Sequence, residues 1–158
     1  MKKLNLGSGE DYRKGYINVD LYCKSDLKLD LNILPYPFEN NSFEEVLAYN
    51  IIEHLKDPYE VLMEIHRICK NKAGIYIQVP HFTSGNAWAD IQHKRPFSLK
   101  SFSNPNMKPY FKVIKCEVRG LFGFIGNAFP RLWEYLLCFM LPSGDMFVEL
   151  EVIKNGEI

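Results

Sequence analysis

The chain has 158 residues, of which 47% are apolar and 24% are charged. This length and composition are typical of one globular domain with a hydrophobic core, so we expect a single domain over residues 1–158. The 19 basic and 19 acidic residues cancel. Because there is no basic excess, we expect no nucleic-acid partner.

Cysteine usage and the N-terminus indicate the compartment. The four cysteines form no C-x-x-C pair and are too sparse for a disulfide framework: Cys23, Cys69, Cys116 and Cys138. We expect them to be reduced and mostly structural. The N-terminus has two lysines but lacks the apolar stretch of a signal peptide. These features predict a cytoplasmic protein.

Seven short runs have the character of β-strands. They are residues 3–7, 16–20, 27–31, 44–50, 74–80, 110–118 and 145–154. Apolar and polar side chains alternate, as where Leu4 and Leu6 flank Asn5. The first three runs are too close together for the crossover helices that parallel strands normally need. We therefore expect an α/β fold with helices largely on one face of the sheet. The other face would be polar and free of helices, and would carry Lys3, Asn5, Asn18, Lys28, Tyr76 and Gln78.

One helix is expected between the fourth and fifth strands, over residues 57–72. Asp57 can cap its first turn, Pro58 fits the first helical position, and Glu60 completes a capping-box-like start. Apolar residues recur at helical spacing along it, which indicates a face that packs on the sheet. Gly74 is the expected stop signal.

Residues 121–142 form the most apolar segment, and we expect a helix in its second half, from about Pro130. The run is about long enough to span a bilayer. Pro130 interrupts it, however, and strands flank it on both sides, so we expect no transmembrane span. Three interpretations stay open: the segment packs on the core, lines the pocket of a substrate, or rests on a membrane surface.

Glycines and acids stand where the expected strands end. The first strand runs into Gly7-Ser8-Gly9, the second ends at Asp20, and the third leads to Asp30. Ligands of parallel sheets bind beyond the carboxyl ends of the strands. Glycine allows close approach of the backbone, and a carboxylate can accept two ribose hydroxyls. The pattern therefore indicates a nucleoside-binding site.

Short sequences along residues 4–80 resemble, in order and spacing, the class I S-adenosylmethionine-dependent methyltransferases of the small type 11 group. The matching pieces are LNLGSG, INVDL, DLNILPYPFENNSFEEV, NIIEHLKDP and EIHRICKNKAGIYIQVP, followed by HKRPFS. The resemblance implies a Rossmann-like, mostly parallel sheet of minimal size. It also implies S-adenosylmethionine as the cofactor and methyl transfer as the activity.

The resemblance also implies roles for individual residues. The cofactor-binding set is Gly7, Ser8, Gly9, Asp20, Leu21, Asp30, Leu31 and Asn50. The two glycines would line the methionine and ribose part, and Asp20 would hold the ribose diol. Asp30 and the backbone of Leu31 would bracket adenine, with Asn50 near the methionine. The cofactor half would be about residues 1–80 and the acceptor side about 81–158.

Histidines are the candidate bases for methyl transfer. His54, His81 and His93 fall in segments expected near the mouth of the pocket, and an imidazole can remove a proton near neutral pH. We select His81 and His93 as the catalytic candidates; His54 is expected to be a packing or supporting residue. The spacing of the histidines matches no compact ligand motif, so we expect no metal.

Several alternatives stay open. The chain could be a binding or scaffold protein that keeps the S-adenosylmethionine site without catalysis. A Rossmann oxidoreductase that binds NAD is less favoured, because the turn lacks the third glycine and the helix that receive pyrophosphate. The acceptor stays open between a small molecule, a lipid-linked sugar and a protein side chain, and so does a homo-oligomer.

Overall fold

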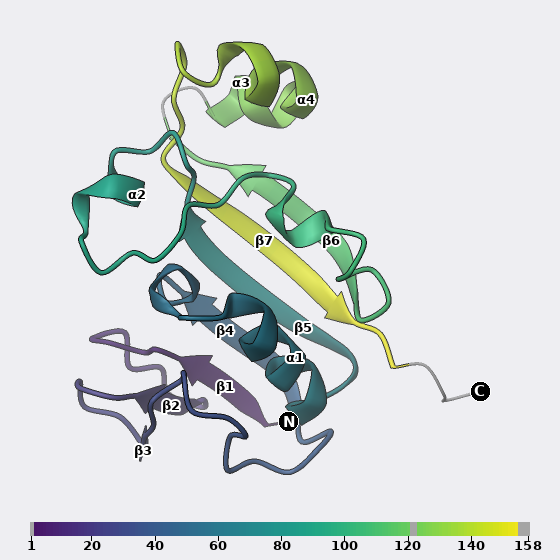
Figure 1. Cartoon of the computed structure of the whole chain (residues 1–158). Coiled ribbons are helices and arrows are strands. Elements are labelled where there is room, and N and C mark those ends of the chain that lie inside the picture. Colours follow the sequence, from purple (N-terminus) through teal and green to yellow (C-terminus); the bar gives the residue numbers. More distant parts are fainter. Residues whose placement is uncertain (1, 121–122, 155–158) are drawn as a thin grey trace.

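A computed structural model describes residues 2–120 and 123–154, which form a seven-stranded sheet in the order β3-β2-β1-β4-β5-β7-β6 (Figure 1). The strands are β1 Lys3–Leu6, β2 Ile17–Asp20, β3 Leu27–Lys28, β4 Phe43–Tyr49, β5 Cys69–Pro80, β6 Phe111–Val118 and β7 Asp145–Val152. All pairs among β1 to β5 are parallel, whereas β7 runs antiparallel between β5 and β6. The seven expected strands and the mostly parallel sheet are confirmed.

The register of the strands separates an apolar row from a polar one. Leu4 lies beside Val46, which lies beside Ile75, and all three are buried in the main core. One residue further along, Asn5 begins a row on the opposite face that reaches Tyr76. Because side chains alternate along a strand, one face of the sheet forms the hydrophobic core and the other does not.

The principal helix, α1 Pro58–Ile68, begins where expected and ends earlier. The carboxylate of Asp57 accepts hydrogen bonds from two backbone N–H groups of the first turn, at 2.9 and 3.2 Å. The expected extension to residue 72 is wrong, because Cys69 is already extended and begins β5. Gly74 is therefore a strand residue and not a stop signal. The remaining helical turns are η1 Ile52–His54, α2 Asn86–Ala89 and η2 Ser101–Ser103.

Figure 1 shows α1 and the segment between β5 and β6 over one face of the sheet, with α3 and α4 beyond the strand ends. The helix-free face is less wet than expected. Asn5 and Asn18 are buried, and the Asn5 amide donates to Asn18 Oδ1 at 3.0 Å and to the carbonyl of Asp11 at 2.8 Å. The loop of residues 8–16 thus covers these amides without a helix, and each finds a hydrogen-bond partner.

The apolar segment is helical in both halves, as α3 Gly123–Ala128, α4 Pro130–Leu132 and the π-helical turn η3 Trp133–Leu137. Leu121 and Phe122, its first two residues, lie outside the described residues. Helix α3 was not expected from the sequence, since glycines weaken helices. A Cβ at Gly126 would lie 2.7 Å from Val118 Cγ2, so glycine permits α3 to pack closely on β6.

This segment has one buried side and one exposed side. Trp133 is 0% exposed and joins the core, and its indole N–H donates to the carbonyl of Leu141 at 2.9 Å. The exposed side carries large apolar groups: Phe124, Phe129, Leu132, Tyr135, Leu136, Phe139 and Met140. Within the described ranges, no helix has both the length and the apolar character needed to cross a membrane.

Candidate functional site

Two cavities lie side by side at the carboxyl ends of the parallel strands. The N-terminal cavity, about 530 Å³, is lined by residues that follow β1, β2 and β3 and by part of η1. The central cavity, about 610 Å³, is lined by residues around the ends of β4 and β5 and by residues 86–93. His54 lines both cavities. Ligands in the two cavities would therefore meet at this side chain.

The glycine turn forms one wall of the N-terminal cavity. Gly7 has a φ of +62°, and a Cβ there would lie 2.4 Å from Ile51 Cγ1. The backbone N–H of Ser8 donates to the carbonyl of Val19 at 3.0 Å, which ties the turn to β2. The Ser8 hydroxyl is buried and has no hydrogen-bond partner among the described residues. Ser8 therefore supports the turn from behind the cavity wall.

Asp20 ends β2 and organises the backbone around it. Its carboxylate accepts hydrogen bonds from the backbone N–H groups of Gly9 at 2.8 Å, Tyr22 at 2.8 Å and Cys23 at 2.7 Å. Burial alone would raise the pKa of Asp20, but these three donors outweigh it and lower the pKa. A carboxylate has about four acceptor positions. Asp20 therefore stays ionised and keeps room for one further hydrogen bond.

Asp30 and Leu31 form another part of the wall of the N-terminal cavity. Asp30 Oδ1 accepts from the backbone and side-chain N–H groups of Asn32, at 2.9 and 3.0 Å, and these bonds lower its pKa. The Tyr36 hydroxyl donates to the Leu31 carbonyl at 2.9 Å. The second oxygen of Asp30 accepts no hydrogen bond from the described residues, so it is available to a ligand.

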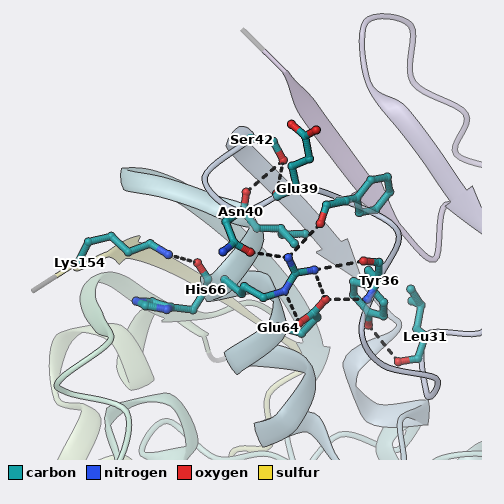
Figure 2. Close-up of polar contacts among 11 residues, drawn as sticks. Leu31, Tyr36, Glu39, Asn40, Ser42, Glu64, His66 and Lys154 are labelled. Carbon is teal, nitrogen blue, oxygen red and sulfur yellow. Dashed lines mark hydrogen bonds and ion pairs between the residues drawn. The ribbon is translucent and has the colours of Figure 1, made fainter.

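A network of charged groups fastens this wall to α1 (Figure 2). Glu64 Oε1 accepts from the backbone N–H of Tyr36 at 2.6 Å and from Arg67 Nη2 at 2.5 Å. The same guanidinium donates to the carbonyl of Phe38 at 2.9 Å and to Asn40 Oδ1 at 2.6 Å. The loop after β3 is thereby held by side chains from a helix that is distant in sequence.

The structure brings five of the eight expected cofactor residues together in the N-terminal cavity: Gly7, Asp20, Leu21, Asp30 and Leu31. Ser8 and Gly9 support the turn without lining the cavity, and Asn50 lines the central cavity. Asn50 has a φ of +51°, a conformation that asparagine tolerates, and its N–H donates to the Gln78 carbonyl at 2.9 Å. That these residues bind a cofactor stays a prediction.

Two functional candidates were not selected from the sequence. Glu53 lines the central cavity, although it is only 1% exposed, and burial raises its pKa to about 7. His54 lies between the two cavities rather than behind them, and burial lowers its pKa. Both residues lie in the stretch NIIEHL, which is part of the resemblance to the methyltransferases. Nothing in its spacing shows which of its side chains would reach a cavity.

His93 reaches the central cavity through a loop that is pinned to η1. The backbone N–H of Lys94 donates to the Glu53 carbonyl at 2.7 Å. His93 Nδ1 lies 3.1 Å from the carbonyl of Ala87, which can only accept a hydrogen bond. Nδ1 therefore carries the proton, and Nε2 keeps its lone pair. Glu53, His54 and His93 present side-chain ligand atoms within 4.8 Å of one another, the geometry of a candidate metal centre.

His81 has a different environment. It is fully buried, its Nδ1 is 2.8 Å from the hydroxyl of Thr83, and its ring packs 5.0 Å from that of Trp133. Burial lowers its pKa, although Glu134 lies 3.7 Å from its Nε2. His81 lines neither cavity. The structure therefore separates the two histidines that were grouped as candidate bases, and only His93 borders the site.

Residues 11–77 match a family model described as a methyltransferase domain. An uncharacterized protein of Methanocaldococcus jannaschii is 31% identical over 109 residues, which is 63% of this chain. The match covers 48% of that protein, so the chain spans about half the length of this relative.

Solved structures share the fold at low sequence identity. An S-adenosylmethionine-dependent methyltransferase from Archaeoglobus fulgidus superposes with a TM-score of 0.69 and 17% identity, covering 95% of this chain and 85% of that one. A second, from Mesorhizobium loti, gives 0.64 and 13%, covering 95% and 90%. The [4+2]-cyclase SpnF gives 0.65 and 11%, covering 96% and 75%. The chain therefore has the Rossmann-like fold of the class I S-adenosylmethionine-dependent methyltransferases and carries a match to their domain family over residues 11–77.

Proposed function

We propose that the chain binds S-adenosylmethionine in the N-terminal cavity and transfers its methyl group to an acceptor in the central cavity. The observation that carries this proposal is the shared wall at His54, which joins a cavity lined by five expected cofactor residues to a second cavity. A ligand in the first cavity could thus present a reactive group to a ligand in the second. Alignment of two bound reactants supplies most of the acceleration in such reactions.

The residues of the N-terminal cavity fit this cofactor. Its volume of about 530 Å³ lies within the range of small-molecule sites. Asp20 has one free acceptor position for a ribose hydroxyl, and the free oxygen of Asp30 can accept from the adenine amine. Lys94 lines the same cavity and can pair with the carboxylate of the methionine part. If the Asp20 carboxylate accepts hydrogen bonds from both ribose hydroxyls, as expected, one of the three backbone N–H groups that it now binds must move away.

The central cavity determines what the acceptor can be. When bound, the cofactor supplies a methyl group on a positively charged sulfur, which leaves as a neutral thioether as the acceptor's lone pair attacks. Glu53, Asp90 and Asp145 line the cavity, and the described lining includes no lysine or arginine. Such a wall disfavours anionic acceptors and suits a hydroxyl or an amine. The lone pair of His93 Nε2 can take the acceptor's proton.

The test is an assay of S-adenosylhomocysteine release with a panel of alcohols, amines and lipid-linked sugars. We expect acceptor-dependent release by the wild type. Asp20→Ala should bind S-adenosylhomocysteine more weakly by about 1.5–3 kcal/mol, the scale of a hydrogen bond to a charged group, and lose most of the release. Asp11→Ala, which removes an exposed acid of the neighbouring loop, should retain both. Unchanged affinity in a folded Asp20→Ala protein would contradict the site.

The remaining alternatives differ in this assay. A scaffold protein without catalysis would bind the cofactor and release no product with any acceptor. The SpnF protein shares this fold and is a cyclase, so the fold alone does not determine the activity. Cofactor binding and methyl transfer are therefore measured separately. A cytoplasmic location stays a prediction from the sequence, and the oligomeric state stays open.

A further inference from the structure

We propose that Glu53, His54 and His93 form a binding site for a divalent cation at the wall of the central cavity. The three side chains offer two imidazole nitrogens and one carboxylate oxygen, and these atoms lie within 4.8 Å of one another. Ligands placed about 2.0–2.2 Å from a Zn²⁺ ion stand roughly 3–3.5 Å apart. Small side-chain rotations would therefore close the set around an ion.

Hydrogen bonds hold these three residues together, although His93 lies far from the other two in sequence. Lys94 N–H donates to the Glu53 carbonyl at 2.7 Å, and Arg95 Nη2 donates to the Lys56 carbonyl at 2.8 Å. These bonds pin residues 93–95 against η1. The rings of His54 and His93 meet edge to face, with centroids 4.7 Å apart. The cluster therefore rests on two anchored segments and not on mobile surface side chains.

Glu53 supplies an independent observation. The residue is 1% exposed, and its Oε2 is buried without a hydrogen-bond partner among the described residues. An unpaired buried carboxylate oxygen is costly, so such groups normally have a hydrogen bond, a counter-ion or a metal. The elevated pKa of Glu53 has the same origin, since burial disfavours its charged form. A cation at this oxygen would remove the penalty.

His93 is oriented as a ligand. It donates Nδ1–H to the Ala87 carbonyl, and its Nε2 is the nitrogen that keeps a lone pair. A histidine that binds a metal through one nitrogen usually donates the other N–H to a carbonyl or carboxylate, which fixes the ring. His93 has that second partner in place, and its ring contacts that of His54 edge to face.

The surrounding charge favours a cation. Asp90 and Asp145 line the same cavity, and Asp90 Oδ2 lies 4.0 Å from His93 Nε2. Two imidazoles with one carboxylate and an open position are a typical Zn²⁺ set and also suit other borderline divalent ions. The open position would face the central cavity. On the proposed function, the ion would therefore select acceptors that carry an oxygen donor, and His93 would act through the ion rather than as a free base.

The experiment is calorimetric titration of Zn²⁺ alone into chelator-treated, full-length protein. We expect one ion per chain in the wild type, and at least tenfold weaker binding in His93→Ala and in the isosteric Glu53→Gln. His66→Gln and Glu60→Gln, which alter a histidine and a glutamate outside the cluster, should bind as the wild type does. Circular dichroism shows whether each variant is folded. If His93→Ala is unfolded, the Zn²⁺ affinity of Glu53→Gln alone tests the site.

Two results would overturn the site. One is the absence of Zn²⁺ binding by the wild type, and the other is binding that is equally strong in both cluster variants, which would assign the ion to cysteines or surface acids. Titration of S-adenosylhomocysteine in the same samples separates this proposal from the proposed function. Zn²⁺ binding without cofactor binding would refute only the latter, and cofactor binding without Zn²⁺ binding would refute only the cation site.

Discussion

Gly7 and Gly9 share a left-handed backbone conformation but differ in what surrounds them. Both have positive φ, +62° and +52°, but a Cβ would collide with Ile51 only at Gly7. We predict that Gly9→Ala costs about 1–2 kcal/mol, the penalty of the left-handed conformation, and that Gly7→Ala costs clearly more. Urea unfolding measures both. Gly85→Ala, where φ is ordinary and no atom lies near, should be nearly neutral.

The Gly7→Ala protein should also bind S-adenosylhomocysteine less tightly, since displaced Ile51 lines the N-terminal cavity. Equal stability losses in Gly7→Ala and Gly9→Ala would contradict the close contact with Ile51. Loss of affinity in Gly85→Ala would show that the binding assay reports general damage rather than this wall.

Single residues were predictable where a topological rule applies to them. Gly7, Asp20 and Asp30 follow strands, and the carboxyl ends of parallel strands meet at one edge of the sheet. Glu53 and His93 follow no such rule. They meet because residues 93–95 fold back onto η1 through backbone hydrogen bonds, and the sequence does not show that pairing. The spacing of the histidines therefore speaks only against metal sites whose ligands are close in sequence.

At the scale of elements, the contact between α1 and the loop after β3 links stability to binding. Arg67 joins Glu64 to the carbonyls of Tyr36 and Phe38. We predict that Arg67→Ala lowers the free energy of unfolding by about 2 kcal/mol, because it removes hydrogen bonds that involve charged groups. It should also weaken S-adenosylhomocysteine binding severalfold, since Tyr36 holds the Leu31 carbonyl.

The matched control is Lys70→Ala, which removes an exposed ion pair with Glu44 on the neighbouring strand. Exposed pairs of this kind contribute little, so neither stability nor affinity should change much. Arg67 is expected to position the loop without touching the ligand. If Arg67→Ala loses stability but keeps full affinity, the network only holds the fold together.

A second contact between elements predicts a pH dependence. His66 on α1 has its Nε2 2.8 Å from the Ile153 carbonyl, and its ring packs against Tyr110. Burial lowers its pKa below the ordinary value of 6.5, and Lys154 lowers it further. The unfolded chain therefore binds this proton at higher pH than the folded chain, and acidification below about 6.5 favours unfolding.

Replacement of His66 by glutamine removes this proton uptake and keeps a donor for the carbonyl. We predict that the wild type loses stability relative to His66→Gln as the pH falls from 7.5 to 5.5, measured by urea unfolding at each pH. Other histidines titrate equally in both proteins, so only the difference is informative. A difference that is constant with pH, or that changes in the opposite direction, would contradict the assignment.

The elements themselves differ in how far the sequence determines them. Alternation identified β1, β2, β3 and β5, because in each of these strands apolar side chains point to the core and polar side chains point the other way. The end of α1 was misplaced because residues 69–72 have no breaker, and β5 begins there through pairing with β4 that includes a bulge. Helix α3 was missed because its glycines serve a tight contact with β6, and helix propensity does not report such contacts.

At the scale of the whole molecule, residues 123–142 form a segment with one buried side and one exposed side. The buried side includes Trp133, whereas Phe139 on the other side is 81% exposed. We predict that Trp133→Ala costs about 3–5 kcal/mol, the usual loss for a buried tryptophan, and that Phe139→Ser changes stability by less than about 0.5 kcal/mol. Thermal and urea unfolding compare the two.

The buried and exposed sides of this segment need separate tests. Replacement of Phe129, Leu132 and Trp133 together would mix a core mutation with two surface mutations, since Phe129 and Leu132 are exposed. Phe129→Ser with Leu132→Ser should leave both fold and cofactor affinity intact, so a loss of methyl transfer would implicate the exposed side in acceptor binding. Unchanged transfer would remove it from the acceptor site.

The overall architecture was the most predictable level, since the missing crossover helices follow from the short connections between the first three strands. The polar face was predicted as wet, but the loop of residues 8–16 folds over Asn5 and Asn18. Amide side chains are polar in sequence whether water or a loop satisfies them. The sequence therefore shows which face lacks helices and does not show what else covers it.

We propose that S-adenosylmethionine binds in the N-terminal cavity with its sulfur toward His54. A crystal structure of the protein with S-adenosylhomocysteine tests this binding mode. We predict adenine beside Asp30 and Leu31, a ribose hydroxyl within hydrogen-bonding distance of Asp20, and the sulfur at the opening to the central cavity. A cavity that stays empty at saturating ligand, or a ligand bound elsewhere on the sheet, would refute it.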